Sequence, residues 1–137
     1  MGLLQSTEEI INLLNYDWTN LNKRETRETE LKFNSAIENF NSELINTTDS
    51  KLLEQIIKKD KQDFILPIEI MFKTYQRLIE IRLYNEKILL DFAEYLKISG
   101  PDWDEEANEI VENVKIKQLE VAVKIAKTVD YNKYQHR

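Results

Sequence analysis

Residues 88–101 read ILLDFAEYLKISGP, and this stretch decides the fold class. Its apolar residues recur at the three- and four-residue spacing of one helix face; they are Leu89, Phe92, Ala93 and Leu96. Gly100 suits the left-handed position that closes many helices, and Pro101 cannot continue a helix. The stretch therefore predicts a helix that buries one face and ends at Gly100.

The segments before this helix show the same apolar spacing. Ser6 and Glu9 form a capping-box pattern, which predicts a helix that begins near Thr7. The apolar spacing allows either one long helix from about Thr7 to Ile45 or a bend near Asp17 that divides it into two, and we favour the bend. A polar loop around Thr47 follows. Two further helices are expected between this loop and Asn85, which is a plausible N-cap of the helix that ends at Gly100. Together these segments predict a chain that is helical throughout.

The segment after Pro101 contains no Gly or Pro, so we expect one long helix from Asp102 or Asp104 to about Tyr131. It carries two apolar stripes, whereas a surface helix normally carries one. The second stripe is either covered by the N-terminal helices or contacts a second chain. The expected partner-binding residues are Ile116, Leu119, Val123, Ala126, Tyr131 and Tyr134.

Length and composition restrict the function classes. The chain has 137 residues, 42% of them hydrophobic, which fits a single all-helical domain over residues 1–137, with residues 1–46 as a candidate N-terminal helical extension. Two Gly, one His and no Cys disfavour nucleotide-binding glycine loops, zinc sites, disulfide scaffolds and histidine triads. We expect an all-α antiparallel bundle of five or six helices with a long C-terminal helix, and no cofactor.

Charge and hydropathy restrict the partners. A formal net charge of -6 disfavours general nucleic-acid binding. No apolar run is long enough to span a membrane, and no secretory signal precedes the first helix. We expect a cytoplasmic protein with a protein partner, which includes the option of a homo-oligomer formed through the C-terminal helix.

The segment over residues 88–114 resembles a single tetratricopeptide helical hairpin. The residues that carry the resemblance are Leu89, Phe92, Ala93, Leu96, Gly100, Ala107, Val111 and Val114. The pattern departs from the family by a two-residue insertion around Pro101 and Asp102, and the proline that usually closes the second helix is missing. The resemblance implies a scaffold that binds a peptide or a protein.

An acidic run follows Pro101 and contains no basic residue; it comprises Asp102, Asp104, Glu105, Glu106, Glu109 and Glu112. Carboxylates at the start of a helix complement the helix dipole, and this is the simplest interpretation. A surface for a basic partner and a metal site are the alternatives. A bundle metal site would also need Glu-x-x-His units, which the sequence lacks, so we predict no metal.

The preferred function is a non-enzymatic helical interaction module, a small adaptor or regulator that works through helix faces. The alternative is an acidic inhibitor that occupies a basic or nucleic-acid-binding site of a target protein. A helical enzyme is the third hypothesis, and it would need a closed polar pocket with perturbed carboxylates. Nothing in the sequence is a nucleophile motif or a phosphate loop, so no catalytic residue is predicted.

Overall fold

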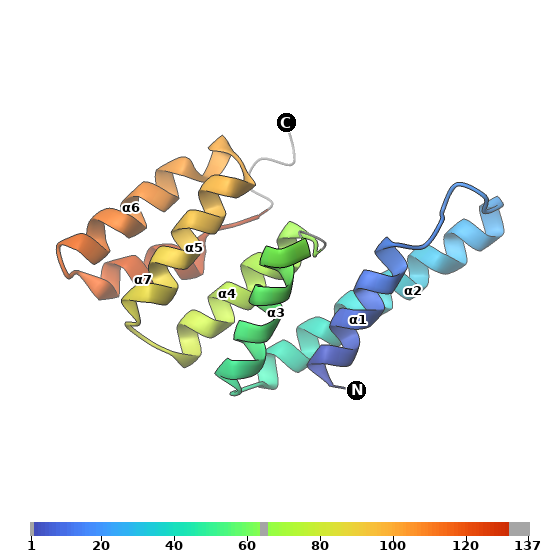
Figure 1. Ribbon diagram of the computed structural model, residues 1–137, viewed down its shortest axis with the longest axis horizontal. Coiled ribbons are helices and arrows are strands. Elements are labelled where there is room, and N and C mark those ends of the chain that lie inside the picture. Colours follow the sequence, from blue (N-terminus) through green and yellow to red (C-terminus); the bar gives the residue numbers. More distant parts are fainter. Residues whose placement is uncertain (1, 64–65, 132–137) are drawn as a thin grey trace. The chain divides into compact units, whose positions relative to one another are not determined.

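The computed structural model describes residues 2–63 and 66–131. Within them the chain forms seven α-helices and one short 3-10 helix, and it forms no strand (Figure 1). The helices are α1 (Leu3–Leu14), α2 (Lys23–Asn46), α3 (Ser50–Asp63), α4 (Ile68–Ile81), α5 (Glu86–Ser99), the 3-10 helix η1 (Pro101–Trp103), α6 (Asp104–Lys115) and α7 (Leu119–Thr128). The expectation of an all-α fold is confirmed.

The chain divides into two compact units, and the boundary falls near the start of α4. Unit 1 covers Met1–Ile70 and unit 2 covers Met71–Arg137. Each unit is described by itself below.

Unit 1 is built on the hairpin of α1 and α2, and α3 packs against α1. The loop between α1 and α2 confirms the expected break near Asp17. This carboxylate accepts hydrogen bonds from the side chain and backbone N–H of Thr19 and from Asn20, and the bonds from Thr19 lower the pKa of Asp17. Trp18 closes the loop, because its indole N–H donates to the carbonyl of Leu13 at 2.9 Å.

The expected capping box at the start of α1 is wrong. The helix begins at Leu3 with Gly2 as its N-cap, so Ser6 lies within the helix and is fully buried. The Ser6 hydroxyl oxygen has no hydrogen-bond partner among the described residues. The helix packs through buried apolar residues at helical spacing, Leu3 and Ile10. This packing determines where the helix begins and overrides the capping signal at Ser6.

A buried carboxylate lies near the end of α3 and gives unit 1 a specific pH dependence. Asp60 is 3% exposed, and its Oδ1 accepts a hydrogen bond from the backbone N–H of Leu66 at 3.0 Å. Burial raises the pKa of Asp60, since it disfavours the charged form, and the hydrogen bond from Leu66 opposes this shift only in part. The folded chain therefore binds this proton more tightly than the unfolded chain does.

We expect Asp60→Asn to stabilise unit 1 at pH 7, because the amide oxygen keeps the bond from Leu66 while the buried charge is removed. The stability difference from the unmutated chain should shrink as the pH falls through the raised pKa of Asp60, where the carboxyl takes up its proton. Urea unfolding at several pH values, followed by Trp18 fluorescence in a Trp103→Phe background, measures this difference. A difference that stays constant with pH would contradict the effect.

Unit 2 is held together by a cluster of aromatic side chains. Phe72 lies at its centre and makes edge-to-face contacts with Phe92, Tyr95 and Trp103, at ring-centroid distances of 5.7, 5.9 and 5.3 Å. Tyr75 stacks on Phe92 at 5.2 Å. The cluster joins α4, α5 and η1, and α6 and α7 pack against α5 around it.

The last part of the chain differs from the expected long helix. The helix that begins at Asp104 ends at Lys115, and the chain reverses before α7 begins at Leu119. The indole N–H of Trp103 donates to the carbonyl of Asp130 at 3.2 Å, across 27 residues of sequence. The expectation of a continuous C-terminal helix is therefore wrong, and the final helix is short.

Candidate interaction surface

The turn between α6 and α7 is a helix-ending motif without glycine. The backbone N–H of Gln118 donates to the carbonyl of Asn113 at 2.8 Å, and that of Lys117 donates to Val114 at 3.1 Å. This pair of bonds is the Schellman motif, in which the residue after the helix adopts a left-handed conformation. Lys117 has φ +62° and takes this position, which glycine fills without steric cost.

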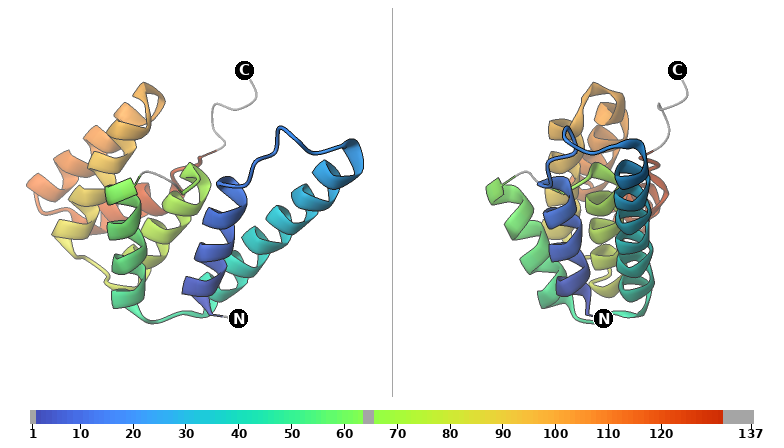
Figure 2. Two further views of the ribbon diagram at one scale, coloured as in Figure 1. Left: turned by 45° about the vertical axis from the view of Figure 1, so that its right-hand side comes forward. Right: turned by 90° about the vertical axis from the view of Figure 1, so that its right-hand side faces the viewer.

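The turn between α4 and α5 has a second left-handed residue, Tyr84, with φ +64°. Asn85 follows it and caps α5 as expected, because its side-chain oxygen accepts the backbone N–H of Ile88 at 3.1 Å. Gly100 ends α5, as expected, with a positive φ of 148°, although its ψ of 162° is extended and not helical. The α4–α5 and α6–α7 turns lie at the same end of α5 in Figures 1 and 2.

An ion pair and a shallow hollow connect these two turns. Lys117 donates to the carboxylate of Glu86, which lies in the first turn of α5. Beside this pair is a hollow of about 500 Å³, lined by Tyr84 from one turn and by residues 117–121 from the other. The hollow is therefore formed by the reversal of the chain at Lys117.

Large apolar side chains are exposed around this hollow. Ile116 is 52% exposed, Tyr84 45% and Val121 41%, and Leu119 is half-buried. Leu83, which precedes Tyr84, is 50% exposed. We call these five residues the turn surface: Leu83, Tyr84, Ile116, Leu119 and Val121. A group of exposed apolar side chains around a hollow, with charged side chains at its edge, is typical of surfaces that contact another protein.

The structure separates the residues that the sequence analysis expected to bind a partner. Ile116 and Leu119 lie on the turn surface, whereas Val123 and Ala126 are buried in unit 2, where α7 packs against α5 and α6. Val123 and Ala126 therefore belong to the core of unit 2. The buried faces are those of two separate helices and cut across the two expected stripes. They comprise Ala107, Ile110 and Val114 of α6 and Ala122, Val123 and Ala126 of α7.

Two tyrosines near the C-terminus were expected to bind a partner, Tyr131 and Tyr134, and the structure describes only the first of them. Tyr131 is half-buried, and the ammonium of Lys73 lies 5.7 Å from its ring centroid. The backbone just before it is fixed by Gln76, whose side-chain N–H group donates to the carbonyls of Ala126 at 3.1 Å and Val129 at 2.8 Å. Tyr134 lies outside the described residues.

The acidic run is distributed over η1 and α6. All of its members except the half-buried Glu106 are exposed. Asp104, Glu105 and Glu106 lie in the first turn of α6, where carboxylates complement the helix dipole. Within residues 2–63 and 66–131, no three acidic or histidine side chains are grouped so that they could hold a metal ion.

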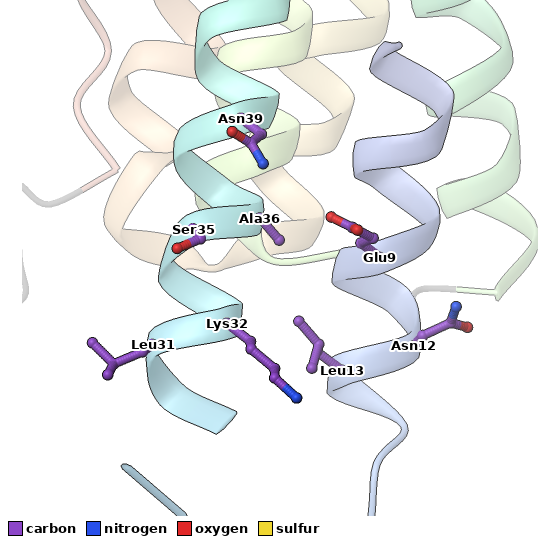
Figure 3. A pocket seen from close by; sticks show the side chains of 8 residues that line it. All are labelled: Glu9, Asn12, Leu13, Leu31, Lys32, Ser35, Ala36 and Asn39. Atoms are coloured by element: carbon purple, nitrogen blue, oxygen red, sulfur yellow. The ribbon is translucent and has the colours of Figure 1, made fainter. Parts of the chain in front are cut away.

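A second hollow lies between α1 and α2 of unit 1 and has a volume of about 530 Å³. Figure 3 shows Leu13 and Ala36 pointing into it, with Glu9 and Lys32 on opposite sides. Its remaining lining residues are Asn12, Leu31, Ser35 and Asn39. This lining combines one acid, one base, three neutral polar side chains and three apolar ones, so it favours no particular ligand, and we take the turn surface as the candidate site.

The turn surface also includes residues that the sequence analysis missed. The sequence patterns assigned no role to Leu83 and Tyr84, which follow the end of α4 at Ile81. The cap at Asn85 was the available signal, because a helix that begins after Asn85 leaves the residues just before it in a connecting turn. The cap at Asn85 alone could not predict that the side chains of Leu83 and Tyr84 are exposed.

Lys117→Gly should stabilise unit 2 by about 0.5–1 kcal/mol, because glycine adopts the left-handed conformation without the Cβ clash. The lost ion pair to Glu86 offsets little of this gain, since the Lys117 side chain is 71% exposed. Lys115→Gly is the matched control: it replaces an exposed lysine inside the last turn of α6 and should destabilise by about the same amount. Urea unfolding of both variants tests whether Lys117 occupies the left-handed position. Destabilisation by both variants would contradict this conformation.

Among the described helices, none has the length and apolar character that crossing a bilayer would require. Comparison of the chain with protein-family models, with curated proteins and with solved structures found no match.

Proposed function

We propose that this chain is a non-enzymatic protein-interaction module, a small adaptor or regulator, and that a protein partner docks on the turn surface. The observation that supports this proposal is the exposure of Tyr84 and Val121 in the lining of one hollow, with the exposed Ile116 directly before Lys117 of that lining. Exposing apolar side chains to water is unfavourable, and a partner that covers them recovers free energy on binding.

The geometry of the turns also suits docking. The positive φ angles of Tyr84 and Lys117 fix the direction in which both turns leave their helices. A surface held in one conformation loses little conformational entropy when a partner binds. The tetratricopeptide-like hairpin of α5 and α6 adds to the proposal, because the resemblance implies a protein-binding scaffold.

Site-specific photo-crosslinking in the source cells tests the proposal. Tyr84 is replaced by the photoreactive amino acid p-benzoylphenylalanine. In a matched control the same replacement is made at Tyr16, an exposed tyrosine in the α1–α2 loop. We expect a discrete adduct with a protein from position 84 and none from position 16. Adding Val121→Glu should abolish the adduct, because a carboxylate on the turn surface would be desolvated by the partner.

Two results would contradict the proposal: no protein adduct from position 84, or equal adducts from both positions. The alternative function, an acidic inhibitor that binds through the exposed carboxylates of α6, gives a different result. Its binding would be insensitive to Val121→Glu, abolished by Glu105→Lys with Glu109→Lys, and steeply weakened between low and physiological salt.

A further inference from the structure

The turn between α6 and α7 is short and strained. It consists of Ile116, Lys117 and Gln118, which lie between the last residue of α6 and the first residue of α7. Lys117 has φ +62°, a left-handed conformation in which its Cβ lies too close to the following carbonyl oxygen. A short connection under strain favours the exchange of the element that follows it between two chains.

The residues of this turn can also form a helix. Residues 114–119 read VKIKQL, and they include no glycine or proline. Lysine, glutamine and leucine are good helix formers, so the segment becomes helical when Lys117 leaves the left-handed conformation. The straightened turn joins α6 and α7 into one continuous helix from Asp104 to Thr128, and α7 then points away from its own unit.

Helix α7 is attached to unit 2 by contacts that a second copy offers in identical form. Its buried residues, Ala122, Val123 and Ala126, lie where α7 packs against α5 and α6. Gln76 and Trp103 donate hydrogen bonds to backbone carbonyls at the end of α7 and just beyond it. Because all of these contacts can form with the α7 of another copy, they favour a second copy of this chain over an unrelated protein.

A dimer with exchanged α7 helices also gains two features that the closed chain lacks. Both copies of Lys117 leave the strained conformation. Ile116, which is 52% exposed, and the half-buried Leu119 are three residues apart, so they face the same side of the continuous helix. The straightened turns of the two copies meet there, and contact between them removes apolar surface from water.

We propose that α7 is exchanged between two copies of this chain, in a dimer in which α6 and α7 form one continuous helix. The closed form predominates in dilute solution, because association costs translational and rotational freedom and a single chain keeps the contacts of α7 only when the turn is closed. Exchange removes the reversal at Lys117 and the hollow beside it, so the dimer does not bind the partner proposed above. Only this last consequence rests on the proposed function.

Sedimentation velocity of the full chain, from about 10 µM to about 1 mM after overnight equilibration, measures the association. We expect the mean mass to rise with concentration and to level off at the dimer. Lys117→Gly should raise the dissociation constant of the dimer at least about 100-fold. Glycine relieves the closed turn and weakens the continuous helix, and each dimer has two such positions.

Two further variants test the role of the turn. Lys115→Gly is the matched control, because position 115 is helical in both forms, and it should change the dissociation constant by less than about fivefold. Lys117→Val should lower the constant, since a β-branched residue adopts the left-handed conformation less readily than lysine. Circular dichroism verifies that every variant remains helical.

Spin labels on different chains distinguish the exchange of α7 from any other dimer. The chain has no cysteine, so one preparation is labelled at Asp102→Cys and another at Asp130→Cys, and the two are mixed and equilibrated at about 1 mM. In the exchanged dimer, Trp103 of one copy donates to the carbonyl of residue 130 of the other, as it does within the closed chain. Double electron–electron resonance should then give a distance between chains below about 25 Å.

A chain that stays monomeric at the highest concentration would overturn the inference, as would a dimer without the short distance between chains. A dimer that Lys117→Gly leaves unchanged would also overturn it. These results leave the proposed function standing, because docking needs only the closed form and is tested by the adduct from position 84. A missing adduct contradicts the proposed function and leaves the exchange of α7 standing.

Discussion

Phe72→Ala should lower the free energy of unfolding of unit 2 by about 3–5 kcal/mol. Phe72 is 1% exposed and is the only ring that contacts Phe92, Tyr95 and Trp103 together among the described aromatic pairs. Truncation to alanine removes all three edge-to-face contacts and leaves a cavity between α4, α5 and η1. The rigid helix ends around this cavity limit how far it can collapse.

Urea unfolding followed by tryptophan fluorescence measures this loss. Trp18 and Trp103 lie in different units, so Trp18→Phe leaves Trp103 as the reporter of unit 2. Ile98→Ala is the control, since it truncates a side chain that is 61% exposed and should change stability by less than about 0.5 kcal/mol. If Phe72→Ala cost no more than this control, the aromatic cluster would not be the core of unit 2.

Gln76→Glu should lower the stability of unit 2 by about 2–3 kcal/mol at pH 7. The Gln76 side-chain N–H group donates to the carbonyls of Ala126 and Val129 at the end of α7. An ionised carboxylate of the same shape has no proton to donate, and it repels the carbonyl oxygens at the negative end of the helix dipole. The substitution therefore replaces favourable contacts by repulsive ones at one position.

The pH dependence distinguishes this mechanism from a simple loss of packing. Repulsion raises the pKa of the introduced carboxyl in the folded chain, so the variant should regain stability relative to the unmutated chain as the pH falls through that pKa. Gln76→Ala removes the donor without adding a charge, and its stability loss should not change with pH. Equal and pH-independent losses in both variants would contradict the capping role of Gln76.

Much of the fold could be predicted from local patterns. The apolar spacing of Leu89, Phe92 and Leu96 and the stop at Gly100 marked α5 correctly, because both signals act within a few residues. The N-cap at Asn85 was correct for the same reason. The capping box at Ser6 failed, since the packing of α1 in unit 1 extends the helix past it.

The reversal at Lys117 could not be predicted from turn chemistry, because no glycine, proline or asparagine occupies the left-handed position. The informative signal was the change from the first apolar stripe to the second, which begins at Ile116, directly after the last residue of α6. That change was interpreted as a helix with two apolar faces. A change of phase is equally typical of two helices joined by a turn, and here the structure has two helices.

The prediction of one continuous helix also explains why some of the expected partner-binding residues are buried. Ile116 lies in the turn itself and Leu119 begins α7, so both remain at the surface. Val123 and Ala126 face α5 and α6 once the chain reverses, and they become core residues. Exposure depends on contacts between helices that are distant in sequence, which a pattern within one segment does not contain.

The chain reversal at Lys117 creates the turn surface, so a distance across the reversal tests the basis of the proposal most directly. The chain has no cysteine, and spin labels can therefore be attached uniquely at Asp102→Cys and Asp130→Cys, two exposed positions that flank the contact between Trp103 and the carbonyl of Asp130. Double electron–electron resonance should give a narrow distribution of label-to-label distances, centred below about 25 Å. A continuous helix at 1.5 Å per residue would instead place the labels about 42 Å apart. A distance near the longer value would show that α6 and α7 are one helix, and the turn surface would not exist.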